Sequence, residues 1–366
     1  MAKISKTMDL SKFRKALTKT IDGISVGFRD PTVWVDTGNY ALNYLISGDF
    51  FKGVPLSKVT ILAGRSGSGK SYITSANLVK NAQAQGIMCV IVDTENAIDE
   101  DWLKKLGVDT AEDKLLKVNI AMINEAAQFI DMFVKGYKEQ YADVPESERP
   151  GVLFVIDSLG MLSDPVAQEQ FASGNVSKGT FGTKAKAIKA LITQCVNLIA
   201  DWNIGLVCTQ HTSVSQDPYS PDDIITGGDG QIFAASIVVA MRKGKLKEDE
   251  SGAKVSDVSG IRAMCTVFKS RFNHKALFKK VEIKIPFESG MIPTSGLFEF
   301  FVDEKMLTKE GNRYSYSGKS GNFLEFRKNI SNDQFMMLMN DYPAFAEAHS
   351  KAVAAAEIEA PEDDEE

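Results

Sequence analysis

The sequence is poor in the residues that form disulfides and zinc sites. It contains four cysteines and three histidines in 366 residues, and none of them shows the paired spacing that is typical of a metal site. Three of the cysteines fall inside apolar runs. We therefore expect reduced thiols in the core of an intracellular protein, and no structural zinc.

Long apolar stretches are also missing. The longest run without a charged side chain is the 15 residues 202–216, whereas a membrane-spanning helix requires about 18 or more. The composition, with 44% hydrophobic and 25% charged residues, is that of a folded chain and excludes the disordered and collagen-like classes. We expect no membrane partner and a cytoplasmic location.

Charge is distributed unevenly along the chain. The formal net charge is −6, but residues 357–366 hold seven acids and no base, which leaves +1 for the rest. Residues 1–20 carry six bases and one acid, and Phe13, Leu17 and Ile21 recur at a helical spacing. These patterns predict an acidic disordered tail over 351–366 and an N-terminal arm over 1–30. The arm docks on a partner or on its own domain, and a transit peptide is the further alternative.

Strand-like and helix-like segments alternate through the first half of the chain. Short apolar runs predict strands at 59–63, 87–92, 152–156 and 204–208. Helices are predicted at 71–85, 122–137 and 183–202. This alternation predicts an α/β fold with a parallel sheet between helices. Strand patterns at 234–241, 262–268 and 280–285 follow without long helices between them, so we expect the sheet to end in antiparallel or mixed strands.

The sharpest motif lies between the first of these strands and the first helix. It has the pattern G-x-x-x-x-G-K-S and consists of Gly64, Arg65, Ser66, Gly67, Ser68, Gly69, Lys70 and Ser71. The glycines let backbone N–H groups point inward at a phosphate chain, and the N-terminus of the next helix favours negative charge. Lys70 is expected to contact the β- and γ-phosphates, and Ser71 to ligate Mg²⁺. The predicted cofactors are therefore ATP and Mg²⁺.

Two carboxylates follow predicted strands. Asp157 ends the apolar run 152–156, where a P-loop protein places the acid that holds the metal through water. Glu95 lies just after the run 87–92, where a carboxylate can orient and deprotonate an attacking water. An acid at a strand end is as often a solvated loop residue, so both assignments depend on the presence of the P-loop.

From Glu95 onward the chain resembles the RecA family, most closely its phage branch, known as UvsX. Residues 95–109, ENAIDEDWLKKLGVD, are similar to the family segment that runs from the catalytic glutamate to an adenine-contacting aspartate and aromatic residue. The resemblance implies that Glu95 is the catalytic carboxylate and that Asp99 and Trp102 flank the adenine. Residues 157–160, DSLG, match the second Walker segment of the family.

Two later segments extend the resemblance to the catalytic site. Residues 208–211, CTQH, occupy the place of the polar γ-phosphate sensor, and His211 stands where UvsX-like proteins have histidine and RecA has glutamine. Residues 267–271, VFKSR, resemble the segment whose two bases, here Lys269 and Arg271, reach the neighbouring subunit's nucleotide. The resemblance covers about residues 33–300. It implies a RecA-type core over 31–300, followed by a small C-terminal subdomain over 301–350.

The resemblance also implies that the loops after Asp157 and after His211 hold DNA. The first loop offers Lys178 and Lys184; Lys186 and Lys189 are equally well explained as a solvated helix face. The second, residues 212–230, contains four aspartates and no lysine or arginine, which disfavours direct neutralisation of phosphates. Its contribution is expected from backbone N–H groups and from apolar or aromatic insertion. The residues concerned are Tyr219, Ile224, Ile225, Gly227 and Gly228. The two glycines belong to a T-G-G stretch that resembles the end of the family's second DNA-binding loop. Residues 234–236 resemble the start of the strand that follows this loop.

These observations predict an ATP-dependent DNA recombinase that forms filaments on single-stranded DNA and catalyses homologous pairing and strand exchange. Its enzymatic activity would be a DNA-dependent ATPase that converts ATP to ADP and phosphate. Expected partners are single- and double-stranded DNA, further copies of the chain, and single-strand-binding and mediator proteins. The alternatives are a hexameric DNA helicase with the same core and a non-catalytic ATP-binding recombination mediator. The phage resemblance implies the cytoplasm of an infected bacterial cell.

Overall fold

The computed structural model describes residues 30–174, 182–214, 223–249 and 252–359, together with Leu10, Ser11 and Phe13. Side chains within 351–359 are not described. Most of the predicted N-terminal arm, the end of the acidic tail, Lys178 and Tyr219 lie outside the described residues. The domain boundaries expected from the sequence remain predictions.

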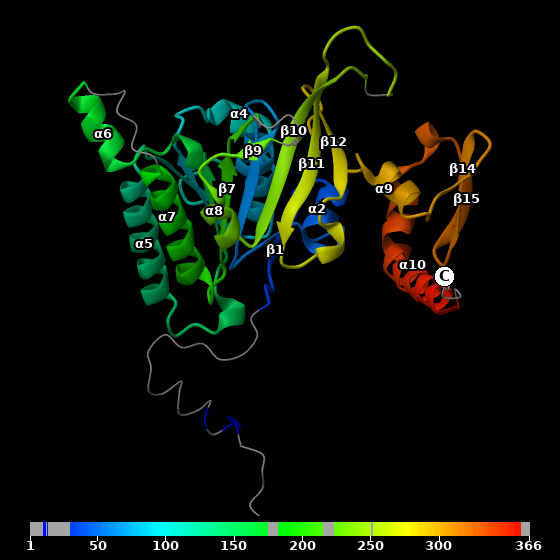
Figure 1. Cartoon of the computed structure of the whole chain (residues 1–366), viewed down its shortest axis with the longest axis horizontal. Coiled ribbons are helices and arrows are strands. Elements are labelled where there is room, and N and C mark those ends of the chain that lie inside the picture. The colour runs from blue at the N-terminus through cyan, green and yellow to red at the C-terminus, as the bar shows by residue number, and fades with distance from the viewer. Residues whose placement is uncertain are drawn as a thin grey trace, which may run out of the picture.

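An eight-stranded sheet forms the centre of the molecule (Figure 1), with the strand order β12-β11-β10-β3-β7-β6-β4-β5. The six strands from β10 to β5 are parallel, and β11 and β12 are antiparallel at one edge. This confirms the predicted mostly parallel sheet with antiparallel strands at its end. The strands are β3 (Val59–Gly64), β4 (Met88–Asp93), β5 (Leu115–Asn119), β6 (Val152–Asp157), β7 (Ile204–Gln210), β10 (Ile237–Leu246), β11 (Gly260–Ser270) and β12 (Lys280–Pro286).

Helices cover both faces of the sheet, because successive residues of each buried strand point to opposite sides. In β3, Ile61 packs in the hydrophobic cluster that contains α5 and α7, whereas Leu62 packs in the cluster on the other face. One face carries α5 (Ile123–Gln140) and α7 (Thr183–Ile199). The other carries α2 (Tyr40–Ser47), the π-helical turns η1 (Tyr72–Leu78) that continue into α3 (Val79–Ala84), and α4 (Glu100–Lys105). The predicted α/β layering is therefore confirmed.

The predicted start of the strand at 234 is wrong. Residues 234–236 were expected to open a strand, but α8 extends to Ala234 and β10 begins at Ile237. The strand begins later because hydrogen-bonded pairing of β10 with β3 starts only at Ile237, opposite Thr60.

The remaining short elements connect the main ones. They are β1 (Trp34–Val35), β2 (Val54–Pro55), η2 (Glu146–Glu148), η3 (Leu159–Met161), α6 (Pro165–Ala172), β8 (Thr212–Ser213), β9 (Ile224–Ile225), α8 (Asp229–Ala234) and η4 (His274–Ala276).

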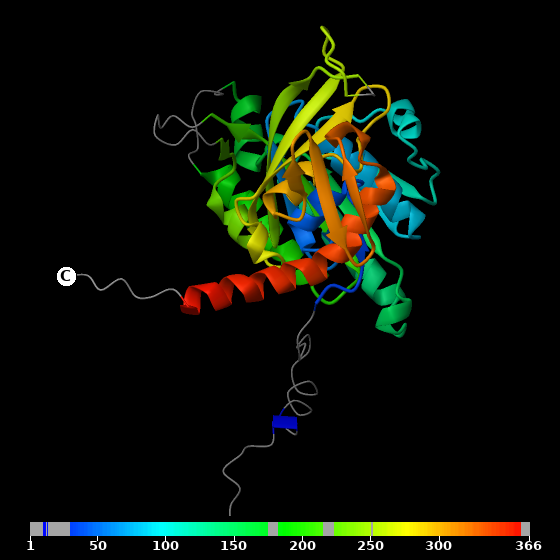
Figure 2. The ribbon, with the colours of Figure 1, turned by 90° about the vertical axis from the view of Figure 1, so that its right-hand side faces the viewer.

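The C-terminal part packs on the core through aromatic rings. Tyr44 of α2 and Phe50 contact Phe300 and Tyr342, with ring centroids 4.8–5.6 Å apart. This part comprises α9 (Leu297–Asp303), β13 (Thr308–Glu310), β14 (Arg313–Gly318), β15 (Gly321–Glu325), η5 (Arg327–Asn329) and α10 (Asn332–Glu359). Figure 2 shows α10 running beneath the three-stranded sheet. The helix extends beyond residue 351, where the tail was expected to begin, and residues 352–356 (AVAAA) are rich in the best helix former.

Among the described residues, no helix combines the length and apolarity that crossing a bilayer requires.

Candidate nucleotide-binding site

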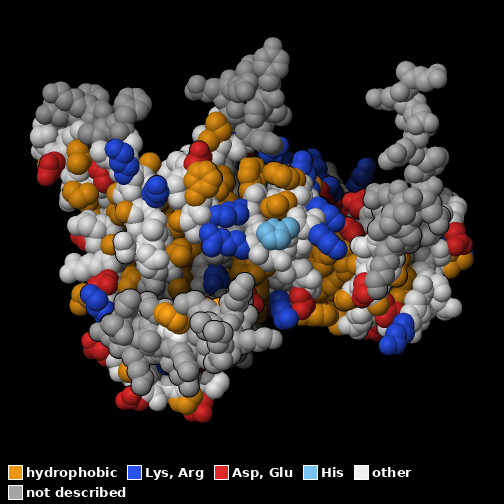
Figure 3. All heavy atoms as spheres, turned by 60° about the horizontal axis from the view of Figure 1, so that its bottom comes forward, with side chains coloured by type: hydrophobic (Ala, Val, Ile, Leu, Met, Phe, Trp, Pro, Cys, Tyr) orange, Lys and Arg blue, Asp and Glu red, His pale blue; other side chains and the backbone are white. Residues whose placement is uncertain are grey.

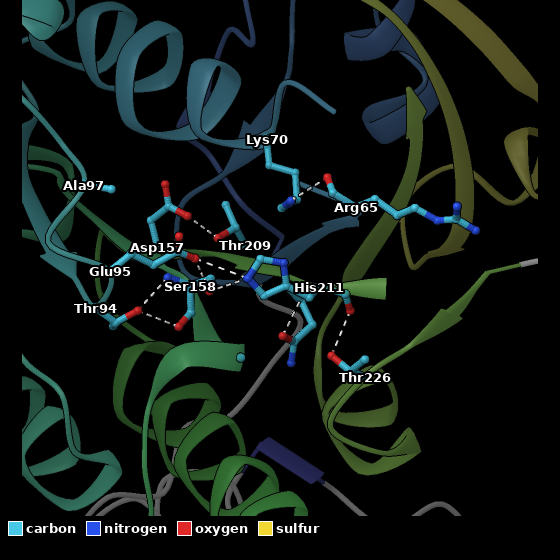
Figure 4. A network of polar contacts seen from close by, with 12 residues as sticks. Arg65, Lys70, Thr94, Glu95, Ala97, Asp157, Ser158, Thr209, His211 and Thr226 are labelled. Atoms are coloured by element: carbon cyan, nitrogen blue, oxygen red, sulfur yellow. Dashed lines mark hydrogen bonds and ion pairs between the residues drawn. The ribbon is translucent and has the colours of Figure 1, made fainter. Parts of the chain in front are cut away.

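The predicted catalytic residues meet at the carboxyl edge of the parallel strands. The P-loop follows β3, Glu95 follows β4, Asp157 ends β6 and His211 follows β7. These four strands lie side by side in the order β3-β7-β6-β4, and Asp93 of β4 is in register with Asp157 of β6. The parallel topology therefore brings together residues that are up to 147 positions apart in the sequence (Figure 4).

The P-loop has the backbone that a phosphate cradle requires. Gly67 and Gly69 have φ angles of +72° and +92°, a region that side-chain-bearing residues rarely adopt. At Gly69 a Cβ would lie 2.8 Å from Cδ1 of Ile285, so a side chain here would also have to displace Ile285. Both features hold the turn in a tight form whose N–H groups can face an anion.

Lys70 is held ready inside this loop. Its ammonium donates hydrogen bonds to the carbonyl oxygens of Gly64 (2.8 Å) and Arg65 (3.1 Å), and the residue is only 6% exposed. Burial lowers the pKa of Lys70 below its ordinary value, and the negative charges of Asp157 and Glu95 oppose that shift. A phosphate that replaced the two carbonyls would compensate this buried cation with full negative charge.

Asp157 is fixed by two hydroxyls. Its Oδ1 accepts a short hydrogen bond from Thr209 of β7, and its Oδ2 accepts one from Ser75 at 3.3 Å. Asp157, Ser71, Glu95 and Trp102 line one cavity of about 260 Å³. The carboxylate of Asp157 and the hydroxyl of Ser71 form an incomplete set of oxygen donors. Such a set fits Mg²⁺, because that ion commonly takes its remaining ligands from phosphates and water. Within the described ranges, no group of three or more His, Cys, Asp or Glu residues forms a complete metal cage.

Glu95 is presented by a turn that Asp93 organises. The Asp93 carboxylate is 1% exposed and accepts hydrogen bonds from the backbone N–H groups of Glu95, Ala97 and Ile98. Lys117 of β5 neutralises it, with Nζ 3.1 Å from Oδ2. Asp93 therefore holds the backbone of this turn in place. The Glu95 side chain is 34% exposed and faces the cavity.

His211 contacts Glu95 directly. Its Nε2 lies 3.2 Å from Glu95 Oε1 and 3.2 Å from the hydroxyl of Ser158, which itself donates to Glu95 Oε1 at 2.8 Å. The backbone of His211 is tied to the following loop, because its carbonyl accepts from the N–H and the hydroxyl of Thr226. The predicted γ-phosphate sensor thus lies between the predicted catalytic carboxylate and the second predicted DNA loop (Figure 4).

Trp102 lies on α4 and lines this cavity, whereas Asp99 directly precedes the helix. Trp102 also lines a neighbouring cavity of about 580 Å³ that includes Gly67, Lys70 and Phe287. Asp99 caps α4, because its Oδ1 accepts the N–H of Trp102 at 2.9 Å. The structure gives Asp99 this capping bond, and its predicted contact with adenine remains a prediction.

Lys269 and Arg271 lie at the opposite edge of the sheet. Lys269 is in register with Val238, which pairs with Ile61, whereas the P-loop begins three residues later at Gly64. Three residues of a strand span about 10 Å, and the catalytic groups extend further still, beyond the carboxyl end of β3. Lys269 donates to the carbonyls of Ile232 and Phe233, at 2.9 and 2.6 Å. These two bases therefore do not meet Lys70 of their own chain.

The predicted DNA-binding residues differ in their surroundings. Ile224 is 54% exposed, whereas Ile225 is 6% exposed and packs in the core cluster with α7. Insertion of Ile225 into DNA is therefore excluded by its burial, and insertion of Ile224 remains a prediction. The difference arises because successive residues of β9 point to opposite faces of the strand.

Lys184 in the first loop donates a hydrogen bond to the carbonyl of Gly160 at 2.5 Å, and burial lowers the pKa of Lys184. Gly227 and Gly228 have φ angles of +88° and +77°, which allows the turn before α8.

The second loop also contacts the P-loop. Asp223 accepts two hydrogen bonds from Arg65, from Nε at 3.1 Å and from Nη2 at 2.5 Å. The Asp223 side chain is 12% exposed and that of Arg65 is 47% exposed. Sequence patterns do not reveal this pair, since the partners are 158 positions apart. Asp93, Ser158 and Thr209 are hidden for the same reason: each is an ordinary polar residue at a strand end until the sheet aligns it with its neighbours.

Comparison with known proteins agrees with this geometry. The family model described as the RecA N-terminal domain matches residues 29–292. Protein RecA of Nocardia farcinica is 26% identical over 293 residues, which cover 79% of this chain and 76% of that protein. Protein RecA of Mycobacterium sp. (strain KMS) is 25% identical over 294 residues, and that of Rhodococcus jostii 25% over 295, each covering 80% of this chain and 76% of the relative. Since the family model covers more than half of its length, the chain belongs to the RecA family.

Proposed function

We propose that the chain is an ATP-dependent DNA recombinase that assembles into filaments on single-stranded DNA and catalyses homologous pairing and strand exchange. The observation that carries the proposal is the separation of the catalytic groups. The carboxyl edge of the parallel strands holds Lys70, Glu95, Asp157 and His211. The opposite edge, where these strands begin, holds Lys269 and Arg271. A complete set of charges around a γ-phosphate then requires a second copy of the chain, as when an arginine finger acts in trans.

The surface around the two bases supports such assembly. Phe233 and Phe278 are 71% and 72% exposed, and Phe268 is 37% exposed; all three lie close in the sequence to the amino end of β10 or the carboxyl end of β11. The view from this side shows apolar side chains beside basic ones (Figure 3). Exposed apolar groups of this kind mark interaction surfaces. A contact between this edge and another copy's carboxyl edge is heterologous and builds open polymers when its rotation does not close.

Within each site, the chain's own residues would act in distinct ways. The P-loop N–H groups and Lys70 would bind the phosphates, and Ser71 and Asp157 would hold Mg²⁺, which would supply positive charge that neutralises the phosphates. Glu95 orients water and takes its proton. His211, in contact with both Glu95 and the loop that contains Thr226, can report the state of the γ-phosphate to that loop. Hydrolysis to ADP and phosphate would then weaken the filament, so that the nucleotide acts as an assembly switch.

We also propose, from His211 alone, a narrower placement in the phage branch of the family. The relatives named above are bacterial RecA proteins, and they do not bear on this narrower placement. We also propose a cytoplasmic location and partners that include double-stranded DNA, single-strand-binding proteins and mediators.

Electron microscopy with ATP and single-stranded DNA tests the proposal. We expect extended helical filaments, and strand exchange between a fluorescent duplex and a homologous single strand that depends on ATP. Closed rings that unwind duplex DNA would favour the helicase alternative. Nucleotide binding without hydrolysis or filaments would favour the mediator.

A further inference from the structure

Ser158 is the buried centre of the polar network around Glu95. It follows Asp157 directly, is 0% exposed, and is fixed by Thr94, whose Oγ1 accepts the N–H of Ser158 and donates to its carbonyl, both at 2.8 Å. The N–H of Thr94 in turn donates to the carbonyl of Asp157 at 2.9 Å. These hydrogen bonds join the ends of β4 and β6, so the backbone that carries the Ser158 hydroxyl is held in place.

The hydrogen-bond inventory of the network defines the role of that hydroxyl. Glu95 as a carboxylate offers only acceptors, so the Ser158 hydroxyl proton points at Oε1 (2.8 Å). His211 Nε2 lies 3.2 Å from both Ser158 Oγ and Glu95 Oε1, and a proton on Nε2 satisfies both acceptors. Two protons then serve the three groups without conflict. Both hydrogen bonds that reach Glu95 go to Oε1, which leaves Oε2 for the water that Glu95 is proposed to deprotonate.

We infer that Ser158 is a positioning residue that aims Glu95 at the attacking water, an inference that rests on the proposed ATPase function. His211 holds Glu95 as well, but its backbone is bonded to Thr226 of the second loop, and its own proposed target is the γ-phosphate. When His211 turns to that target, Ser158 is the donor that keeps Glu95 in place. Ser158 can do so because it stands on the joined strand ends and not on a loop.

The close fit around Ser158 supports this role. A Cβ at Gly160, two residues further on, would lie 2.9 Å from the His211 ring and 2.7 Å from Oε1 of Gln210. The Gln210 amide oxygen accepts the N–H of His211 at 2.9 Å. The turn after Ser158 therefore packs directly against the sensor segment, and Ser158 Oγ can reach Glu95 and His211 together (Figure 4).

Kinetics of Ser158→Ala protein test the inference. We expect kcat for DNA-stimulated ATP hydrolysis to fall roughly ten- to a hundredfold, as for a misplaced catalytic group, with KM for ATP and the binding of a fluorescent ATP analogue changed by less than about twofold. Ser295→Ala is the matched control. Ser295 is also buried and hydrogen-bonded, to Asn39 and Ile292, but it touches no residue of the site, and its kcat should stay at the wild-type value.

A double-mutant cycle separates positioning from a general structural effect. If Ser158 acts through Glu95, adding Ser158→Ala to Glu95→Gln should lower the residual kcat by less than about twofold. An equal loss in both backgrounds, or a rise in KM instead of a fall in kcat, would overturn the inference. A thermal melt shows whether each variant is folded, and Ser158→Cys, which keeps a weak donor, should regain part of the lost kcat. A wild-type chain without DNA-stimulated hydrolysis would contradict the proposed function and this inference together, whereas an active wild type with fully active Ser158→Ala protein would contradict the inference alone.

Discussion

Glu95 combines partial exposure with strong fixation, which its proposed role as a catalytic base requires. Its side chain is 34% exposed, yet the backbone before it is anchored by Asp93 and its Oε1 by Ser158 and His211. None of these contacts involves the P-loop. The proposed function therefore assigns binding and hydrolysis of the nucleotide to different residues of one site.

Replacing Glu95 by glutamine should separate these two functions. We expect Glu95→Gln protein to retain ATP and DNA binding and its filaments to persist, while turnover falls at least about a hundredfold because the general base is gone. Steady-state ATPase assays and nucleotide-binding titrations measure both effects. Glu100→Gln, at an exposed position on α4 where the carboxylate pairs with Lys104, is the control and should hydrolyse ATP normally. Loss of nucleotide binding in Glu95→Gln protein would make Glu95 a structural acid.

Two elements of the site are joined by the pair between Arg65 and Asp223. One partner lies in the P-loop, and the other precedes β9 in the second loop. The proposed function places this loop near DNA, and the pairing would neutralise the charge of Asp223 within the protein. It also means that Arg65 does not present its full charge to an approaching phosphate chain.

Asp223→Asn should therefore bind ATP more tightly. Removing the carboxylate releases the positive charge of Arg65 at the entrance of the P-loop, and we expect Kd to fall roughly two- to fivefold at low ionic strength, with the gain lost in about 0.5 M salt. Titration with a fluorescent ATP analogue at both salt concentrations measures this. Asp229→Asn, a change of the same kind in α8, should leave Kd as it is. Weaker binding by Asp223→Asn protein would mean that the pair supports the P-loop and does not restrain Arg65.

The main elements could be predicted because their sequence signals are local. Strand β6, for example, is an apolar run that ends at an acid, and the P-loop glycines fix a turn that few other residues permit. Strand β5 escaped prediction because only Leu115 of its five residues is buried, so it lacks an apolar pattern. The contacts of Ser158, Asp223 and Ile225 depend on which strands become neighbours, and that information is spread over the whole chain.

At the scale of the whole molecule, charge is divided between a near-neutral body and an acidic C-terminus. The seven acids within residues 357–366 can compete with DNA phosphates for basic surface by screened electrostatics. Their effect must then depend on charge and not on particular contacts.

Truncation after Ala356 should strengthen DNA binding. We expect affinity for double-stranded DNA to rise severalfold at low salt and the difference to vanish as salt screens the acids. Fluorescence anisotropy across a salt series measures this. A full-length chain in which the seven acids become Gln or Asn should behave like the truncated one. Equal affinities of all three proteins at every salt concentration would show that the tail serves only solubility.

The central claim is that each ATPase site is completed by a second copy of the chain. The most direct test mixes Lys70→Ala protein, which has an impaired P-loop and intact bases, with Lys269→Ala protein, which has the reverse. Each variant alone should show little DNA-stimulated hydrolysis. In an equal mixture about one interface in four joins an intact P-loop to intact bases, so a comparable fraction of wild-type activity should return. A mixture no more active than its components, with Lys269→Ala protein active without assembly, would contradict the claim.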